Sequence, residues 1–325
     1  MSCFHPLIGI DTGEKTASGK VKYFIRKRED SADFQKEIDL NPHILLPCGH
    51  CIGCRIDYSR AWADRMMLEL QTSKKAIFVT LTYDNEHAPW SQFDENGYPL
   101  YASLNKRDCQ LFMKRLRERF DCKIRFFLAG EYGPSTLRPH YHAIIFGLGI
   151  DDFHDLKSHG TNELGQCYYI SDCLSSIWCN GFVLLSDVSW KTCAYVARYV
   201  TKKLNGPASI EYAERNVISE FSLMSRKPGI GKKYLDLHPE CLDYENINIS
   251  TADSGLKIRI PKYYYRQLQL TDPERYDKIM SERKQFAEDS MILQLQKTGL
   301  SFLDYLEVKE EKKRAQLKTL KRGAV

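Results

Sequence analysis

The chain has 325 residues, 43% of them hydrophobic, which allows one large domain or two of ordinary size and excludes an intrinsically disordered protein. Lys and Arg number 47 against 42 Asp and Glu, so the net charge of +5 is too small to identify a partner by itself. There is no secretory signal and no apolar run of about 18 residues, so we expect no membrane contact and a cytoplasmic protein whose 11 cysteines stay reduced.

A group of three cysteines is the first strong local pattern. Cys48, Cys51 and Cys54 follow one another at two-residue spacings, and glycines between them let the backbone turn. Such spacing is typical of thiolate ligands to zinc, which needs a fourth ligand to complete a tetrahedron. Three reduced cysteines without a metal are the alternative interpretation, and an iron–sulfur cluster is a weaker one because nothing else suggests redox chemistry. The candidates for the fourth ligand are Cys3, which we favour, His5 and His50.

Residues 76–204 contain the clearest succession of strands and helices. After a helix predicted over residues 59–71, the order is strand, helix, strand, strand, helix, strand, helix. The expected bounds are 76–83, 105–120, two strands within 123–147, a short helix ending near 180, 181–188 and 191–204, with a loop over 84–101. This order predicts an α+β fold, namely a ferredoxin-like, split βαβ antiparallel sheet with helices on one side and an added helix.

The pattern divides the chain into three segments. They are 1–75 with the cysteines, 76–205 with the sheet, and 206–325 with a basic loop and a helical C-terminal extension. Local excesses of Lys and Arg in the helix over 105–120 and near the C-terminus suit a polyanionic ligand. The basic, glycine-containing loop with Arg226 and Lys227 is expected to contact phosphates, although it lacks a nucleotide-binding loop pattern.

Two histidines stand out in the second of the paired strands. Because side chains alternate along a strand, His140 and His142 point to the same face, with Cα atoms roughly 7 Å apart. Glu131, near the end of the preceding strand, is placed to lie beside them. Two His and one carboxylate on one sheet face predict a three-sided cation site with open positions. The alternative is a solvated or hydrogen-bonded histidine pair.

The helix that follows the last strand carries two tyrosines. Tyr195, Tyr199 and Lys202 fall at i, i+4 and i+7 and share one face. A phenol is a weak nucleophile, but a phenolate beside a cation is able to attack a phosphodiester that a divalent ion polarises. The alternative is that both tyrosines only cap the core.

Taken together, these motifs resemble a known family. The strand RPHYHAIIFG and the helix YVARYVTKK resemble the HUH endonucleases, specifically the rolling-circle replication initiators of microviruses, which are small single-stranded DNA phages. The segments PCGHCIGCR, FVTLTYD, MSRKPGIG and IPKYYYRQL are similar to motifs of the gokushovirus-type members, and these anchors span most of residues 3–268 in family order. One departure is Tyr141, where the family usually has a bulky hydrophobic residue.

The resemblance implies a role for individual residues. His140 and His142 match the metal-binding histidines, and Tyr195 and Tyr199 match the paired nucleophiles. Glu131 is expected as the third ligand from its position, because the motif does not fix it. The implied metal is Mg²⁺ or Mn²⁺, in addition to the structural Zn²⁺ expected at the cysteines. Other expected roles are assistance in catalysis by Lys202 and DNA contacts by Thr80, Thr82, Arg198, Lys203, Arg226 and Lys227.

The resemblance also implies a reaction and partners. A tyrosine cuts a single-stranded DNA origin by transesterification, forms a 5′-phosphotyrosine and leaves a 3′-OH that primes rolling-circle synthesis; the second tyrosine then helps to release a closed circle. Because the sequence contains no Walker motif, unwinding is expected from a host helicase, and synthesis from a host DNA polymerase in the bacterial cytoplasm. The alternatives are a transposase or relaxase of the same superfamily, and a non-catalytic zinc-knuckle protein that binds nucleic acid.

Overall fold

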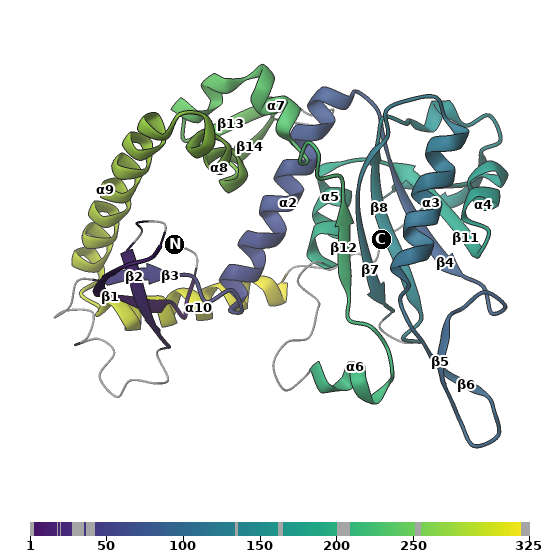
Figure 1. Cartoon of the computed structure of the whole chain (residues 1–325), viewed down its shortest axis with the longest axis horizontal. Coiled ribbons are helices and arrows are strands. Elements are labelled where there is room, and N and C mark those ends of the chain that lie inside the picture. Colours follow the sequence, from purple (N-terminus) through teal and green to yellow (C-terminus); the bar gives the residue numbers. More distant parts are fainter. Residues whose placement is uncertain are drawn as a thin grey trace. The chain divides into compact units, whose positions relative to one another are not determined.

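The computed structural model describes residues 3–17, 19, 21–27, 36, 43–133, 136–161, 165–199, 209–250 and 255–319 (Figure 1). The chain divides into two compact units. Residues 1–58 together with 267–322 form one, called here the terminal unit, and the other, the central unit, consists mainly of residues 59–266. Helix α2 (Ile52–Ser73) begins in the first and continues into the second.

The terminal unit combines a small sheet with two long helices. Strands β1 (Leu7–Lys15), β2 (Val21–Arg26) and β3 (His43–Leu46) pair antiparallel in the order β2-β1-β3, which the sequence did not predict. Helices α9 (Pro273–Thr298) and α10 (Phe302–Thr319) confirm the helices expected over residues 272–320. The Asp272 side chain caps the start of α9, and Gly299, with a φ of 66°, ends it.

The central unit is built on a seven-stranded antiparallel sheet with the order β12-β7-β8-β4-β11-β10-β9. The four predicted strands form its contiguous centre. Strands β9, β10 and β12 extend it, although the sequence suggested irregular structure there. The bounds are β4 Ala76–Tyr83, β7 Arg125–Tyr132, β8 Pro139–Phe146, β9 Lys157–Thr161, β10 Cys167–Ile170, β11 Gly181–Asp187 and β12 Phe221–Met224.

One face of this sheet carries the larger core. In β4 the odd-numbered side chains from Ile77 to Tyr83 are buried on this face, as strand alternation requires. Helix α3 (Lys106–Arg119) and helix α4 (Asp172–Trp178) cover it, with Phe112 and Trp178 among their buried residues. The basic side chains of α3 therefore belong to the face opposite to the histidines.

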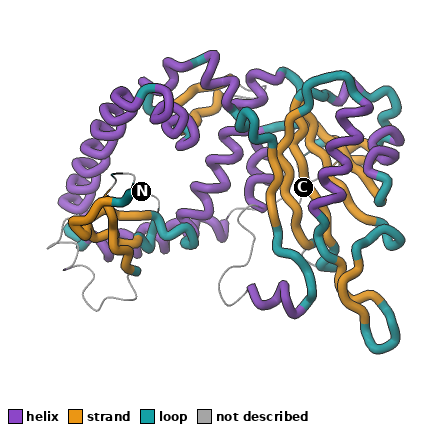
Figure 2. The backbone as a smooth tube through the Cα atoms, viewed as in Figure 1, coloured by secondary structure: helices purple, strands orange, loops and turns teal. Residues whose placement is uncertain are grey.

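The other face is covered by α5 (Trp190–Tyr199) and by part of α2. The ring of Trp62 in α2 lies 4.9 Å from that of Phe127 in β7, measured between centroids, and Val196 and Ala197 of α5 are fully buried. Helices thus lie on both faces of the sheet (Figure 2), whereas the sequence placed them on one side apart from the added helix.

The remaining elements are short. The predicted loop over 84–101 contains a hairpin of β5 (Trp90–Phe93) and β6 (Pro99–Ala102). The others are the 3₁₀ helices Ile150–Asp152 and Pro239–Asp243, α6 Ile210–Glu214, α7 Lys232–Leu237, β13 Asn246–Ser250, β14 Gly255–Arg259 and α8 Lys262–Thr271. Tyr264 of α8 is fully buried, and its hydroxyl donates to the Gly231 carbonyl over 2.6 Å, so it belongs to the core.

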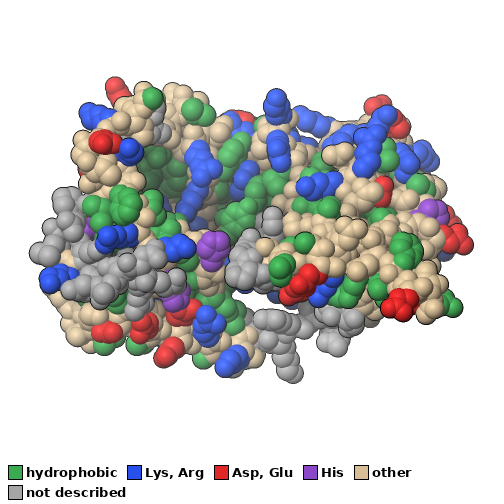
Figure 3. All heavy atoms as spheres, turned by 60° about the horizontal axis from the view of Figure 1, so that its bottom comes forward, with side chains coloured by type: hydrophobic (Ala, Val, Ile, Leu, Met, Phe, Trp, Pro, Cys, Tyr) green, Lys and Arg blue, Asp and Glu red, His purple; other side chains and the backbone are tan. Residues whose placement is uncertain are grey.

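Charged side chains of both signs occur across the face drawn in Figure 3, in agreement with the mild net charge. Among the described residues, none of the helices combines the length and apolar character needed to cross a membrane.

The buried hydroxyl of Tyr141 explains the departure from the family pattern at this position. The side chain is fully buried in the core beneath α3. Its hydroxyl accepts a hydrogen bond from the Asn105 amide over 2.7 Å and lies 3.0 Å from the Tyr83 hydroxyl. Tyr83 in turn donates to Asp108 over 2.7 Å. A polar group at this position is therefore compatible with burial because each neighbouring polar group has a partner.

We expect Tyr141→Phe to destabilise the protein by about 1–3 kcal/mol, because the Asn105 amide loses its acceptor at the start of α3. Urea unfolding of the variant measures this as a lower midpoint at unchanged slope. Tyr98→Phe, at an exposed tyrosine, is the control and should leave the midpoint unchanged. Equal midpoints for Tyr141→Phe and wild type would show that the buried network contributes nothing.

Candidate active site

Strand register brings the predicted cation ligands together. In the antiparallel pair of β7 and β8, Glu131 lies directly opposite His140. His142 lies two residues further along β8, on the same face, and opposite Thr80 of β4. The three side chains predicted from the sequence therefore share one end of the sheet surface.

The three side chains are close enough to bind one ion. Glu131 Oε1 lies 2.9 Å from His140 Nε2 and 3.1 Å from His142 Nε2, and the three ligand atoms lie within 4.8 Å of one another. Ligands bound to one ion at about 2.1 Å and at right angles are about 3 Å apart, so these spacings suit a cation. Glu131 is 2% exposed and His142 4% exposed. This donor set is a candidate divalent-metal site, since two His and one carboxylate are typical ligands.

The outer nitrogens of both rings have hydrogen-bond partners. His140 Nδ1 lies 3.1 Å from the Arg138 carbonyl oxygen, which only accepts, so Nδ1 carries a proton. In the neutral ring the Nε2 lone pair then faces the Glu131 carboxylate. Two acceptors facing each other repel unless a cation lies between them. The polar surroundings of His140 therefore favour an ion at this place.

The predicted tyrosine helix lies against the same histidine. The Tyr199 ring stacks on the His142 ring with centroids 4.9 Å apart and an interplanar angle of 13°. The Tyr195 ring meets His142 edge-on at 5.1 Å and Tyr199 at 4.8 Å. The buried side chains of Cys193 and Val196 attach this helix to the sheet. Both phenols thus lie beside the candidate metal ligands, one helical turn apart.

Burial raises the pKa of both phenols. For Tyr199, the negative charge of Glu131 and a hydrogen bond to it raise the pKa further. For Tyr195, a hydrogen bond from Tyr199 and the Arg198 charge act in the opposite direction without reversing the rise. Both phenols accordingly stay neutral at physiological pH in this environment. A divalent cation bound by Glu131 and the histidines would offset the carboxylate charge and favour the phenolate.

Two residues of β4 support the site in a way that the sequence did not reveal. The Thr80 hydroxyl lies 3.0 Å from His142 Nδ1, so it orients the ring. The Phe78 ring lies parallel to His142 at 5.8 Å and edge-on to Tyr195 at 6.2 Å. Their two-residue spacing places them on one strand face, but only the pairing with β8 identifies His142 as their neighbour.

The other predicted DNA contacts lie in different places. Thr82 is opposite His140 in the pairing of β4 with β8. Arg198 is exposed, with its guanidinium 5.5 Å from the Tyr195 ring centroid. The exposed Arg226 and Lys227 follow β12, whose continuation pairs with the end of β7 that is remote from Glu131, so the structure does not bring them to the site.

Two expected residues cannot be placed. Lys202 and Lys203 lie outside the described residues. The four cysteines predicted to bind zinc come together in the terminal unit.

Comparisons with known proteins identify the family. A family model for replication-associated proteins of the ORF2 type matches residues 76–204, the range that contains the histidines and tyrosines. The chain is 31% identical over 301 residues to the replication-associated protein VP4 of Bdellovibrio phage phiMH2K, covering 89% of this chain and 85% of that protein. The chain belongs to the family of phage replication-associated proteins.

Other members of this family are also similar. The replication-associated protein ORF2 of Spiroplasma virus 4 is 29% identical over 327 residues, which cover 96% of this chain and 95% of that protein. The replication-associated protein ORF4 of Chlamydia phage 1 is 31% identical over 163 residues, covering 49% of this chain and 38% of that protein. The resemblance to microvirus initiators is confirmed by these relatives. No solved structure matches this replication-associated protein.

We expect Thr80→Val to weaken Mn²⁺ binding by ~10-fold, because loss of an outer hydrogen bond to a ligating histidine typically reduces metal affinity by 10- to 100-fold. Calorimetric titration of Mn²⁺ measures the affinity. Thr82→Val is the matched control on the same strand and face and should bind as wild type does. Wild-type affinity in Thr80→Val would mean that the hydroxyl does not orient a metal ligand.

Proposed function

We propose that this replication-associated protein is a metal-dependent DNA nickase and strand transferase of the HUH two-tyrosine type, which initiates rolling-circle replication at a single-stranded DNA origin. The observation that carries the proposal is the contact of both Tyr195 and Tyr199 with His142, whose Nε2 lies 3.1 Å from Glu131. A buried carboxylate, two imidazoles and two phenols form the set of groups that tyrosine transesterification needs.

The sheet order supports the same assignment. Strands β7, β8, β4 and β11 lie side by side and antiparallel, with a helix in each of the connections from β4 to β7 and from β8 to β11. This is the order of a ferredoxin-like, split βαβ arrangement. We therefore assign residues 76–205 as an HUH endonuclease core, between an N-terminal segment and a helical extension.

The residues of the site account for each step of the reaction. Mg²⁺ or Mn²⁺ bound by Glu131, His140 and His142 would polarise the scissile phosphate and stabilise the charge that develops on it. One tyrosine attacks phosphorus through its phenolic oxygen after losing its proton. The bond from phosphorus to the 3′ oxygen breaks, and that oxygen takes up a proton. The products are a 5′-phosphotyrosine and a free 3′-OH.

The second tyrosine allows the circle to be closed. After one round of synthesis it attacks the regenerated origin, and the 3′-OH released by that cut attacks the first phosphotyrosine. The number of phosphodiester bonds is conserved, so no external energy source is required. One helical turn, about 5.4 Å, separates the tyrosines along the helix axis, which favours alternate use at one metal.

The proposed partners follow from this chemistry. The substrate is the single-stranded origin of the phage DNA, and Arg198 beside Tyr195 is placed to contact its phosphates. Because the sequence has no Walker motif, a host helicase and a host DNA polymerase would supply unwinding and synthesis in the bacterial cytoplasm.

We expect Tyr195→Phe and Tyr199→Phe each to retain some covalent adduct on a short single-stranded origin, and the double variant to form none. Phenylalanine removes the nucleophilic oxygen and keeps the ring packed. Denaturing electrophoresis with labelled DNA detects the adduct. Tyr244→Phe, at an exposed tyrosine, is the control and should react as wild type does.

Peptide mapping and the metal ligands complete this test. The nucleotide should be found on Tyr195 or Tyr199, and His140→Ala with His142→Ala should abolish the adduct while DNA binding persists through phosphate contacts. A nucleotide on another tyrosine would contradict the assignment of the helix. DNA binding with no adduct in wild type under any divalent metal would favour the non-catalytic nucleic-acid-binding alternative.

A further inference from the structure

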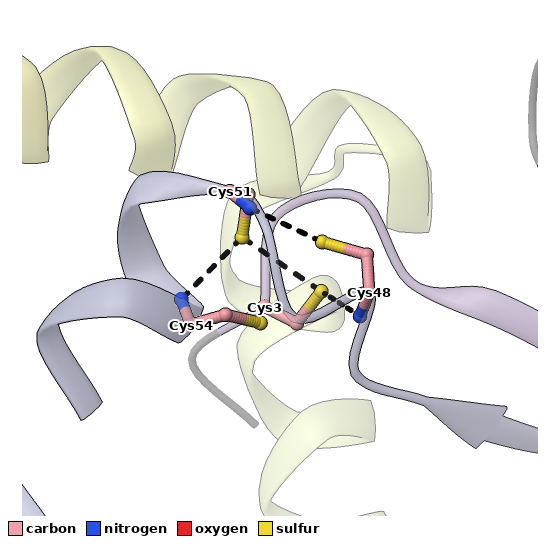
Figure 4. Close-up of side chains that lie close together, drawn as sticks. All are labelled: Cys3, Cys48, Cys51 and Cys54. Carbon is pink, nitrogen blue, oxygen red and sulfur yellow. Dashed lines mark hydrogen bonds between the residues drawn. The ribbon is translucent and has the colours of Figure 1, made fainter. Parts of the chain in front are cut away.

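Four cysteines from separate segments converge in the terminal unit. Cys48, Cys51 and Cys54 come from the turn before α2 and from its first turn, and Cys3 comes from the segment that leads into β1. Their four sulfurs lie within 4.8 Å of one another. Figure 4 shows the four side chains directed at a common centre. Such convergence from opposite ends of a 45-residue separation calls for a physical reason.

The sulfur spacing matches a single tetrahedral ion. Cys51 Sγ lies 3.9 Å from Cys3 Sγ. Zinc–sulfur bonds of about 2.3 Å in a tetrahedron place sulfurs about 3.8 Å apart. A disulfide needs about 2.05 Å, and all four cysteines are free thiols. A four-iron cluster holds its cysteine sulfurs farther apart, because the cluster occupies the space between them.

Backbone amides are directed at the sulfurs. The amides of Phe4 and Cys54 donate to Cys51 Sγ over 3.4 and 3.5 Å, and the amide of Cys51 donates to Cys48 Sγ over 3.3 Å. The amide of Cys48 donates to Cys3 Sγ over 3.3 Å. Four thiolates on one divalent ion leave a net charge of −2, and these donors are placed to stabilise that charge.

The structure also chooses among the candidates for the fourth ligand. His50 is exposed and is not part of the cluster. His5 Nε2 lies 2.6 Å from Glu310 Oε2 of α10, so its side chain is directed elsewhere. Cys3 is 2% exposed and lies within the group of sulfurs. With four protein sulfurs there is no open position for water or substrate, which is the arrangement of structural rather than catalytic zinc.

We infer that Cys3, Cys48, Cys51 and Cys54 bind one structural Zn²⁺, which fixes the segment before β1 to the first turn of α2 and thereby holds His5 on Glu310 of α10. The inference does not depend on the proposed nicking activity, because none of these residues belongs to the candidate active site.

The contact with α10 gives the zinc a structural consequence. Glu310 is 8% exposed, and besides His5 it accepts a hydrogen bond from Arg314 over 2.7 Å. His5 follows Cys3 by two residues, so the position of its ring depends on where Cys3 is held. Without zinc, the segment that carries His5 loses its anchor, and the buried Glu310 loses one of its partners.

Metal analysis tests the inference directly. We expect about one zinc per chain in desalted wild-type protein, in the His140→Ala, His142→Ala background that removes the other metal ligands, and in Cys122→Ser, an exposed cysteine outside the cluster. Cys51→Ser should hold much less. Cobalt substitution should give the thiolate-to-metal charge-transfer and visible bands of tetrahedral four-sulfur coordination, which an ion held by fewer thiolates does not.

Hydrogen exchange tests the structural consequence and remains informative where Cys51→Ser folds poorly. Titrating wild type with a strong zinc chelator should raise amide exchange in α10 while exchange in β7 and β8 of the central unit changes little. The inference is overturned by protein that carries no zinc, by iron with labile sulfide in its place, by zinc that survives Cys51→Ser, or by α10 exchange that is indifferent to zinc removal.

Discussion

The buried carboxylate of Glu131 is the group on which the geometry of the candidate active site depends. A carboxylate that is 2% exposed is costly unless charge or hydrogen bonds compensate for lost water. Here its Oε1 faces two imidazole nitrogens, and the phenol of Tyr199 contacts the same group. Because one of those imidazoles presents a lone pair, the arrangement is better satisfied by a divalent cation than by the side chains alone. Strand pairing, the Thr80 hydroxyl and the position of α5 all follow from holding these groups around one point.

The two faces of β8 separate this chemistry from the main core. Tyr141, Ala143 and Ile145 point to the face covered by α3 and α4, while His140 and His142 point to the face covered by α5. A shift of one residue in register would exchange the two sets and bury the histidines in the apolar core. Register is therefore fixed strongly by burial, and the position of the candidate ligands comes with it.

Much of the site could be predicted from the sequence, because its signals are periodic and local. The alternation in β8 predicts that His140 and His142 share a face, and the i, i+4 spacing on α5 predicts that Tyr195 and Tyr199 do. The four central strands were recognisable as apolar runs. Strands β9, β10 and β12 were missed because they are short edge strands whose structure depends on a neighbour rather than on their own pattern. The roles of Phe78 and Thr80 were also hidden, since only long-range pairing places them beside His142. Likewise, sequence spacing left Cys3, His5 and His50 as alternatives, and tertiary structure distinguishes them.

The central claim is that Glu131, His140 and His142 bind one divalent ion beside both tyrosines. Anomalous diffraction from crystals soaked in Mn²⁺ measures this most directly. We predict one manganese peak at about 2.1 Å from Glu131 Oε1 and the Nε2 atoms of both histidines, facing Tyr195 and Tyr199. The account would be contradicted if manganese bound elsewhere while both imidazoles kept their direct contacts with Glu131.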